Sequence, residues 1–534
     1  LRACAAYSEG AGIFRILPAA VTVPSTQAAL RRLVVWAAEH RVPLVPRGAG
    51  SGMAGGNVGA GVIVDLTALD GCPVEVHPET RRAFTGTGAT LRDLAADAER
   101  AGLRLPPDPS SARFATAGGM VSTNGGGPRS VRAGSVRRWV EALDLITADG
   151  EPLALRRGAP PGRSAAVTRF QQEAEPVLRG ARDEILTRFP KTRKNSSGYA
   201  LDAWLASGDL LDLVIGAEGT LGLVTGIEWR LAPIPPRCAG ILAALQSHDA
   251  LPEIVPRLLD LDPSAVEYLD ATFLRFAGAA GAGFVGGAEA SGKGRGEGGG
   301  VLMVEFEAAV GEPVKERLHE ARRILAPAVD KLREAADRRG LDELWAIRHA
   351  ASPMLARLGD GRRSMQVIED ACVPIVALGR YIRTVRRVAE QQGIEAVIFG
   401  HVGDGNLHVN LLPDVTRAGW EERLAAIFAE VTAVVVGLGG TLSGEHGDGR
   451  LRTHALPAMY GSAVVELFRK VKQAFDPMGI LNPGVKLPAG GEERPLGGMK
   501  TGSAAAPIPG DIEERLHEVE RSAGYAVPRL ELAG

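Results

Sequence analysis

Two short segments concentrate side chains that could hold a metal ion and move a proton. The first reads HVGDGNLHVN at residues 401–410, and the second reads SGEHGDGR at residues 443–450. Together they carry three of the ten histidines of the chain, beside carboxylates and glycines that let the backbone approach a ligand closely. This mixture of imidazoles and carboxylates predicts a reaction centre.

The spacing within these segments indicates how the side chains could converge. His408 and Asn410 are two residues apart, so they share a face if the segment is extended. The GDGN residues before them are typical of a turn, which would bring His401 back alongside. Glu445 would add an oxygen ligand of the kind that divalent metals accept. Two histidines seven residues apart are not a specific metal signature, so hydrogen-bonded structural histidines are the alternative.

Length and composition limit the class of protein. A chain of 534 residues exceeds one hydrophobic core, so two or three domains are expected. Lys plus Arg (61) nearly balance Asp plus Glu (63), which argues against a nucleic-acid partner. The four cysteines have no CxxC spacing, which favours a reducing compartment over a disulfide framework. We expect neither a membrane span nor a signal peptide, although residue 1 is Leu and an upstream targeting segment stays open.

The first 235 residues alternate apolar runs typical of strands with helical patterns, which indicates an α/β arrangement. Residues 26–40 have the spacing of an amphipathic helix. Residues 42–46 and 62–66 are expected to be strands on either side of a glycine-rich loop.

The middle of the chain mixes strand and helix patterns. Strands are predicted at residues 241–245 and 301–307, and helices at 314–339 and 376–392. The glycine-rich stretch at residues 281–300 predicts a flexible loop.

Three glycine-rich segments predict a site for a long cofactor. The first, PRGAGSGMAGG at residues 46–56, could turn its backbone N–H groups toward an anion, with Ser51 as a hydroxyl donor. A strand rather than a helix is expected after its GxGxxG pattern, so the Rossmann context is missing, and no Walker motif is present. Any one such segment could be a plain mobile loop. Two more, at residues 116–127 and 216–222, favour a cofactor laid along the backbone.

The order of these motifs resembles a known family. PRGAGSGMAGG, PPDPSS (106–111), TAGGMVSTNGGG, GAEGTLGLVT and DPMGILNPGVK (476–486) are similar to FAD-linked oxidases and dehydrogenases of the vanillyl-alcohol oxidase and p-cresol methylhydroxylase (PCMH) type. HVGDGNLHVN and SGEHGDGR resemble the D-2-hydroxyacid dehydrogenase branch, which contains the D-lactate, glycolate and D-2-hydroxyglutarate dehydrogenases. The resemblance covers about residues 15–488.

This resemblance implies an α+β fold. It places a two-subdomain PCMH-type FAD-binding domain at residues 1–235 and a substrate, or cap, domain with an antiparallel sheet at 236–470. Residues 471–488 would return to the FAD site. The tail at 489–534, rich in Gly, Pro and Ala at its start, is predicted to be flexible, with a short charged helix at 511–522.

The resemblance also implies non-covalent FAD, because Ser51 occupies the place where many relatives carry a histidine that tethers the flavin. The residues that match the FAD-binding motifs come from all the glycine-rich loops and the C-terminal segment. They are Arg47, Gly48, Ala49, Gly50, Ser51, Gly52, Gly55, Pro107, Asp108, Ser110, Thr116, Gly118, Gly119, Asn124, Gly125, Gly134, Glu218, Gly219, Gly222, Asn482 and Lys486.

By the same resemblance, His401, His408 and Glu445 would bind a divalent metal, Zn²⁺ or Mn²⁺. His446 would be the catalytic base and Asn410 would orient the substrate. Oxidation of a 2-hydroxyacid needs this set, because an alcohol is too weak an acid to lose its proton unaided. An imidazole can accept that proton near neutral pH.

Arg348, in the segment ELWAIR, matches the position of the arginine that clamps the substrate carboxylate in relatives. Some hydroxyglutarate-specific relatives carry a lysine before the position of Val373. Here Ile368, Glu369 and Asp370 stand nearby, which weakens the assignment to hydroxyglutarate.

A polar cluster of Lys194, Asn195 and Tyr199 precedes the third glycine-rich segment. Its simplest interpretation is a helix cap or an exposed turn.

The function implied is FAD-dependent, metal-assisted oxidation of a D-2-hydroxyacid to the 2-oxoacid, with hydride transfer to flavin N5. Electrons would pass to a quinone, an electron-transfer protein or an iron–sulfur partner, because no cysteine beyond Cys372 could hold a cluster in the C-terminal region. The alternatives are an oxidase that uses O₂ and a non-catalytic FAD-binding subunit of a glycolate-oxidase-like complex. A cytoplasmic location is expected, with peripheral association at the inner face of the membrane left open.

Overall fold

A parallel three-stranded sheet carries the first glycine-rich loop. In the computed structural model, which describes residues 1–278, 299–355, 358–359, 361–488 and 496–534, the strand order is β1-β3-β2. These strands are β1 Ala20–Thr22, β2 Leu44–Arg47 and β3 Val62–Asp65. The predicted helix and both predicted strands of this region are confirmed. Helix α2 (Gln27–His40) begins after Thr26, whose side chain accepts a hydrogen bond from the backbone N–H of Ala29.

A five-stranded antiparallel sheet, β4-β5-β9-β7-β8, completes the N-terminal half. Its strands, with the short pair β6 and β10, are β4 Val74–His77, β5 Arg82–Gly86, β6 Leu103–Arg104, β7 Val140–Ile146, β8 Pro152–Arg156, β9 Leu223–Arg230 and β10 Ala232–Pro233. The helices of this half, besides α2, are α1 Arg2–Ala6, α3 Leu91–Arg100, α4 Ala117–Thr123, α5 Ser130–Ala133, α6 Ala165–Arg169, α7 Glu175–Gly180, α8 Arg182–Arg188, α9 Leu201–Ser207 and α10 Leu210–Val214.

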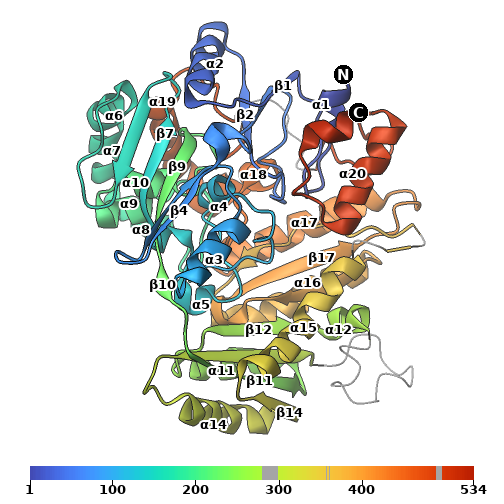
Figure 1. Cartoon of the computed structure of the whole chain (residues 1–534). Helices are drawn as coiled ribbons and strands as arrows, with labels where there is room; N and C mark the ends of the chain where they lie inside the picture. Colours follow the sequence, from blue (N-terminus) through green and yellow to red (C-terminus); the bar gives the residue numbers. More distant parts are fainter. Residues whose placement is uncertain (279–298, 356–357, 360, 489–495) are drawn as a thin grey trace.

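A seven-stranded antiparallel sheet, β14-β11-β13-β12-β16-β17-β15, forms the second half, seen in the lower part of Figure 1. Its strands are β11 Arg237–Leu245, β12 Ala265–Leu269, β13 Val301–Ala308, β14 Val329–Ala335, β15 Ala371–Cys372, β16 Glu395–Gly400 and β17 Asn406–Leu412. The associated helices are α11 Leu251–Leu259, α12 Ala271–Ala277, α14 Val314–Leu325, α15 Arg338–Leu355, α16 Leu378–Gln391 and α17 Trp420–Gly437.

Helices cover both faces of this sheet, so its central strands are buried throughout. Ile241 and Ala243 of β11 pack in the same core as α11, α14 and α16, whereas Leu242 and Ala244 pack with α12 and α15. Alternation of side chains along a strand produces this division. The predicted α+β class with an antiparallel cap sheet is confirmed, as are the strands at residues 241–245 and 301–307 and the helix at 376–392.

The helix predicted at residues 314–339 is wrong beyond Leu325. Pro327 follows that residue and cannot continue a helix, because it lacks an N–H donor and its ring clashes with the preceding turn. The chain then forms β14, which pairs with β11 at the edge of the sheet and exposes most of its charged side chains. Edge pairing therefore overrides a charge-rich pattern that also suits a helix.

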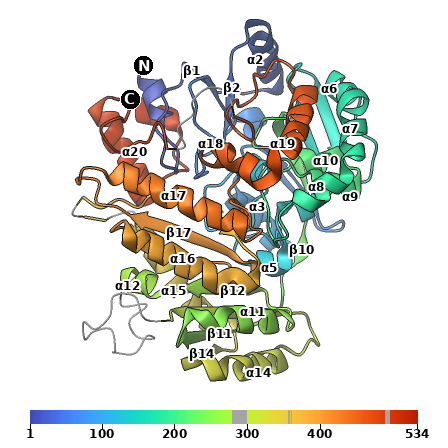
Figure 2. The same cartoon turned by 180° about the vertical axis from the view of Figure 1, so that it is seen from behind.

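The tail predicted to be flexible at residues 489–534 packs against the N-terminal segment from residue 496 onward. Helix α20 (Gly510–Ser522) confirms the predicted short helix, and its Ile512, Leu516 and Val519 are buried in one cluster with Tyr7. These three residues have helical spacing and form an apolar face, which the glycine-rich start of the tail obscures. Figures 1 and 2 both show the two ends of the chain side by side. Residues 489–495, and 279–298 of the predicted loop, lie outside the described residues.

Helix α19 (Leu456–Phe475) returns the chain to the N-terminal half. It follows the short helix α18 (Gly449–Arg452) and packs against α6 and α8. Phe468 contacts the ring of Tyr199, and the hydroxyl of Tyr460 donates to the carbonyl oxygen of Ser197. We expected this return to begin at residue 471, but it begins earlier, with helix α19. None of the helices in the described residues has the length and apolar character needed to cross a membrane.

Candidate active site

A cavity of about 1360 Å³ lies between the glycine-rich loops and the cap sheet. All three loops contribute to its wall. The cap side contributes all six residues that we assigned to metal binding or catalysis. They are Arg348, His401, His408, Asn410, Glu445 and His446.

The first glycine-rich loop follows β2 directly and presents backbone to this cavity. The backbone N–H groups of residues 49–52 donate to no other described residue, so they are available to an anion. The side chain of Arg47 is buried, and its guanidinium donates to the carbonyl oxygens of Tyr7, Glu9 and Asn57. The side chain of Arg47 therefore holds the loop in place, and the backbone N–H groups of residues 49–52 are the part of the loop that could bind a ligand.

The second loop approaches its neighbours so closely that it requires glycine. A Cβ atom at Gly118 would lie 2.0 Å from the hydroxyl oxygen of Thr87. Thr116 begins helix α4, and its side chain accepts a hydrogen bond from the N–H of Gly119. The N-terminal turn of α4 therefore lies at the cavity wall with little space for side chains.

The hairpin formed by β16 and β17 positions three of the polar side chains on the cap side. His401 follows β16, while His408 and Asn410 both line the cavity from β17, as their spacing predicts. The turn between the strands contains Gly405 at φ +75°, and a Cβ there would lie 2.0 Å from the carbonyl oxygen of Val373. Glycine is therefore required for the turn that returns His408 to His401.

Glu445 and His446 lie on a loop that is held by the buried carboxylate of Asp370. Its Oδ2 accepts from the hydroxyl of Ser443 at 2.7 Å and from the backbone N–H groups of Glu445 at 3.0 Å and His446 at 2.8 Å. Three donors on one buried oxygen fix the loop, which directs both side chains toward the cavity.

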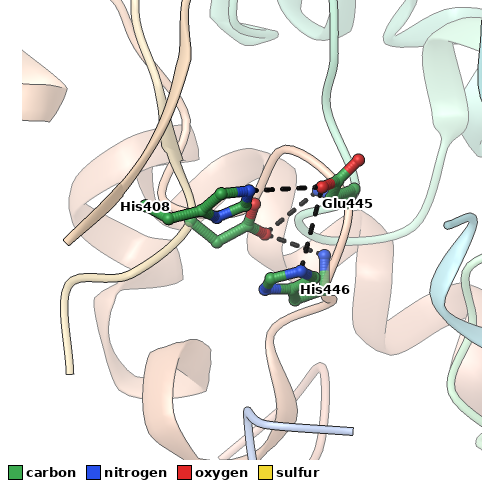
Figure 3. Close-up of side chains that lie close together, drawn as sticks. His408, Glu445 and His446 are labelled. Carbon is green, nitrogen blue, oxygen red and sulfur yellow. Dashed lines mark hydrogen bonds and ion pairs between the residues drawn. The ribbon is translucent and has the colours of Figure 1, made fainter. Parts of the chain in front are cut away.

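Figure 3 shows His408, Glu445 and His446 facing one another. Glu445 Oε1 lies 3.0 Å from His401 Nε2, 3.6 Å from His408 Nε2 and 3.8 Å from His446 Nε2. The Nε2 atoms of His401 and His408 are 3.2 Å apart. Donor atoms of Asp370, His408, Glu445 and His446 also lie within 4.8 Å of one another. The cluster has the imidazole and carboxylate composition of a Zn²⁺ or Mn²⁺ site.

The electrostatic environment of this cluster favours cations. Burial alone would lower the pKa of His401, yet Glu267 raises it to about 9. Burial would also lower the pKa of His446, which Glu369 and Asp370 raise to about 10. Burial and these two neighbouring imidazoles lower the pKa of His408 to about 4. The carboxylates around the cluster thus stabilise positive charge, which a divalent metal could supply in place of protons.

Glu369 holds the imidazole of His446. Its Oε2 lies 2.6 Å from His446 Nδ1, and its Oε1 accepts from the guanidinium of Arg452. Although burial would raise the pKa of Glu369, His446 and Arg452 lower it to about 2, so the carboxylate is ionised. An ionised carboxylate only accepts hydrogen bonds, so Nδ1 keeps its proton in both forms of the ring, and Nε2, which faces the cluster, is the nitrogen that gains or loses a proton.

Lys194 is buried beside Glu445, contrary to its interpretation as part of a cap or exposed turn. Its Nζ lies 2.8 Å from Glu445 Oε2, and both side chains are less than 10% exposed. Burial would raise the pKa of Glu445, but Lys194 and His401 hold it well below its usual range. The N-terminal half thus supplies a cation to the cap-side cluster.

Comparisons with known proteins identify the class of this chain. The family described as the C-terminal domain of FAD linked oxidases matches residues 234–485, and an FAD binding domain matches residues 18–156. A D-lactate dehydrogenase of Archaeoglobus fulgidus is 31% identical over 472 residues, which cover 87% of this chain and 90% of that protein. The chain belongs to the FAD-linked oxidase family. It is an FAD-dependent oxidoreductase.

Other relatives of this FAD-linked oxidase carry related names. The glycolate oxidase subunit GlcD of Bacillus subtilis is 29% identical, with 88% of this chain and 89% of that protein covered. A D-2-hydroxyglutarate dehydrogenase of Escherichia coli is 27% identical over 91% of this chain but only 49% of its own length. A solved alkyldihydroxyacetonephosphate synthase aligns with a TM-score of 0.57 and 15% identity, covering 89% of this chain and 80% of its own, which shows the shared fold.

The structure divides the residues predicted to bind FAD in this FAD-linked oxidase into two groups. Those that line the cavity are Arg47, Gly48, Ala49, Gly50, Ser51, Gly52, Ser110, Thr116, Gly118, Gly119, Gly125, Glu218, Gly219 and Gly222. Those outside the described lining are Gly55, Pro107, Asp108, Asn124, Gly134, Asn482 and Lys486.

Residues of the second group support the wall from behind. Asn482 donates through its Nδ2 to the carbonyl oxygens of Gly56 and Glu218. Lys486 Nζ lies 2.9 Å from Asp448 Oδ2 and 3.1 Å from Glu218 Oε1. The returning C-terminal segment therefore joins the glycine-rich loops to the loop that carries His446.

Sequence reasoning missed several residues of this site. Glu267 is a single acidic residue in the otherwise apolar strand β12, and such a residue is a signal for a buried polar contact. Lys500, His517 and Tyr525 of the tail were missed as well; these three, unlike Glu267, line the cavity. Only the helical spacing of apolar residues in α20 indicates that the tail is folded.

Proposed function

We propose that this protein catalyses FAD-dependent, metal-assisted oxidation of a D-2-hydroxyacid to the 2-oxoacid. The observation that carries the proposal is the convergence of His401, His408, Glu445 and His446 on the wall of the cavity that the glycine-rich loops line. The names of the relatives, D-lactate dehydrogenase, glycolate oxidase subunit and D-2-hydroxyglutarate dehydrogenase, support the substrate class.

FAD would lie along the backbone of the first two glycine-rich loops, and it supplies an acceptor for the hydride that leaves C2 of the substrate. The N–H groups of residues 49–52, which donate to none of the residues that the structure describes, suit its diphosphate. Ser51 offers no imidazole for a covalent bond, so we propose non-covalent binding. The cavity volume of about 1360 Å³ accommodates a dinucleotide and a small acid together.

We propose His401, His408 and Glu445 as ligands of Zn²⁺ or Mn²⁺, which lowers the pKa of a bound hydroxyl group. Asp370 is a weaker candidate, because its Oδ2 already accepts three hydrogen bonds that hold the loop. The Nδ1 atom of His408 lies 2.8 Å from the carbonyl oxygen of Glu369, which leaves its Nε2 free to bind the ion.

His446 is the proposed base. Glu369 holds the Nδ1 proton, so in the neutral ring Nε2 can accept the hydroxyl proton of the substrate while the C2–H bond breaks and the C=O bond forms. The neighbouring carboxylates that raise the pKa of His446 favour this proton transfer. His446 is also the most exposed of the four cluster side chains, at 27%. Arg348 would clamp the substrate carboxylate and Asn410 would orient the substrate, since both line the cavity.

We propose a short 2-hydroxyacid as the substrate in preference to hydroxyglutarate. Glu369 and Asp370 are occupied by His446 and the loop around it, and the neighbouring Ile368 is apolar, so this segment offers no cation for a second carboxylate. We propose that electrons then pass to a quinone or a protein partner at the surface or at a membrane face.

Anaerobic mixing of the FAD-bound protein with paired D- and L-2-hydroxyacids tests the proposal. D-lactate or glycolate should bleach the flavin, and L-lactate should not. His446→Ala should keep FAD but reduce the flavin at least about 100-fold more slowly. His248→Ala is the matched control, since His248 is half-buried in the cap and does not line the cavity. Normal flavin reduction in His446→Ala would refute the mechanism.

The acceptor is measured in the same samples. Faster reoxidation of the flavin by a quinone than by O₂ supports a dehydrogenase, and the reverse identifies an oxidase. A flavin that no 2-hydroxyacid bleaches would favour the non-catalytic subunit instead.

A further inference from the structure

Glu267 connects two parts of the proposed site without lining the cavity. Its side chain is fully buried on β12, in the middle of the cap sheet. One carboxylate oxygen, Oε1, lies 2.6 Å from His401 Nδ1. The other, Oε2, accepts from Arg348 Nε at 3.1 Å. A single carboxylate therefore contacts both a proposed metal ligand and the proposed substrate clamp.

Strand pairing produces this arrangement. β12 and β16 are antiparallel, with Tyr268 opposite Gly400 and Leu269 opposite Phe399. The same register places Glu267 next to His401, directly after the end of β16. Residues that lie directly opposite each other on neighbouring antiparallel strands point to the same face, so Glu267 and His401 share a face.

Arg348 reaches Glu267 from helix α15, which covers this face of the sheet. Its guanidinium packs over the ring of Phe399, with 4.7 Å between the central carbon and the ring centroid. The arginine is thus fixed by an ionic contact on one side and an aromatic ring on the other.

The charges of the three groups are complementary. His401 can bind a metal through Nε2 only if its proton is on Nδ1, and a carboxylate at Nδ1 selects that tautomer. Arg348 neutralises the charge of Glu267 in turn, so the buried carboxylate is compensated.

We infer that Glu267 is a positioning residue that couples metal binding at His401 to substrate-carboxylate binding at Arg348. This inference rests on the proposed function. Neither orientation of a glutamine at this position could replace the carboxylate, since the amide has one accepting and one donating end. Its NH₂ group would face either the N–H of Arg348 or Nδ1 of His401.

Glu267→Gln tests the inference on the full-length FAD-bound protein. Metal is stripped with a chelator, and the affinities for Mn²⁺ and Zn²⁺ are measured by calorimetry. The KM and kcat for a D-2-hydroxyacid are then measured at saturating metal. We expect metal affinity to fall about 10–100-fold. We also expect KM to change by a larger factor than kcat, because Arg348, the proposed substrate clamp, would be displaced.

Glu307→Gln is the matched control. Glu307 is also a buried glutamate of the cap sheet and pairs with an arginine, Arg104, at 2.5 Å, but does not contact the proposed ligands. This variant should lose stability and retain the metal affinity and KM of the wild type. Thermal unfolding of both variants, followed by circular dichroism, compares their losses of stability.

The outcomes separate the inference from the proposed function. Unchanged metal affinity or unchanged KM in Glu267→Gln, with a wild type that binds metal, would overturn the inference alone. Equal losses of metal affinity in both variants would assign the effect to the fold and overturn it as well. A wild type that binds neither metal contradicts the proposed function and the inference together.

Discussion

The two walls of the cavity are built on opposite principles. The glycine-rich wall exposes backbone, and the guanidinium of Arg47 holds the first loop by donating to backbone carbonyl oxygens. The cap wall exposes side chains, and buried carboxylates such as Glu369 and Asp370 hold them from behind. The first wall should therefore tolerate lost side chains but not added ones, and the second wall should respond in the opposite way.

The largest effect is expected from a deletion in the cap wall. Glu445→Ala would remove the nearest carboxylate of Lys194 and one of two carboxylates beside His401. This leaves Lys194 with Asp404 and His401 with Glu267. We expect a loss of about 2–4 kcal/mol in the free energy of unfolding, for two charge-assisted hydrogen bonds, and no measurable binding of divalent metal. Chemical denaturation and calorimetry measure the two quantities. A variant as stable as the wild type would show that Asp404 and Glu267 alone compensate these two cations.

An addition in the glycine-rich wall should have the next largest effect. In Gly118→Val, the new Cβ would lie 2.0 Å from the hydroxyl oxygen of Thr87. We expect a cost of about 1–3 kcal/mol in stability and loss of bound FAD, because α4 must move. The ratio of flavin to protein absorbance after gel filtration measures FAD retention. Full retention of FAD would show that the loop accommodates the new side chain without moving the backbone that faces the cofactor.

Asp270, in the cap half, should make a pH-dependent contribution of about 1–3 kcal/mol to the free energy of unfolding. Burial raises the pKa of Asp270 to about 6, although Arg386 and the N–H groups of Phe273 and Ile398 oppose the rise. Between the unfolded and folded pKa values the folded state binds more protons, so this group stabilises the protein below about pH 4. That contribution is lost as the pH rises through 6.

Asp270→Asn removes this pH dependence and keeps an oxygen that can accept from Phe273 N–H. Urea denaturation at pH 4, 5, 6 and 7 measures the free energy of unfolding of the variant and of the wild type. The wild type should lose stability relative to the variant as the pH rises. A difference independent of pH would show that Asp270 is ionised throughout.

The smallest effect is expected from a deletion in the glycine-rich wall. Ser51→Ala removes only a hydroxyl group from a loop that we propose binds FAD through its backbone N–H groups. The dissociation constant for FAD should increase less than about tenfold, which corresponds to one hydrogen bond. Flavin fluorescence titration of the apoprotein measures it. A complete loss of FAD would mean that this wall also depends on side chains.

The sequence predicted what local patterns determine. The hairpin around His401 and His408 follows from turn residues and alternation within ten residues, and the structure brings these histidines together with Glu445. The first glycine-rich loop follows from flanking strands that are also local. Family resemblance was needed to join these distant segments into one site.

Contacts that depend on register between distant segments could not be predicted. The pairing of β12 with β16 decides that Glu267 meets His401, and no pattern near either residue specifies it. The burial of Lys194 depends on a loop 251 residues later in the chain. Likewise, β14 is a strand because β11 offers an edge, although its own charges also suit a helix.

The contact between the two ends of the chain has a consequence for synthesis. Arg2 pairs with Asp511, Arg15 with Glu513, and the strand bridge of Phe14 with Met499 lies beside the first glycine-rich loop. On the ribosome, residues 2–15 emerge before residues 499–513 and cannot make these contacts until that later segment has been released. The first glycine-rich loop would therefore reach its final form only after residues 499–513 have left the ribosome.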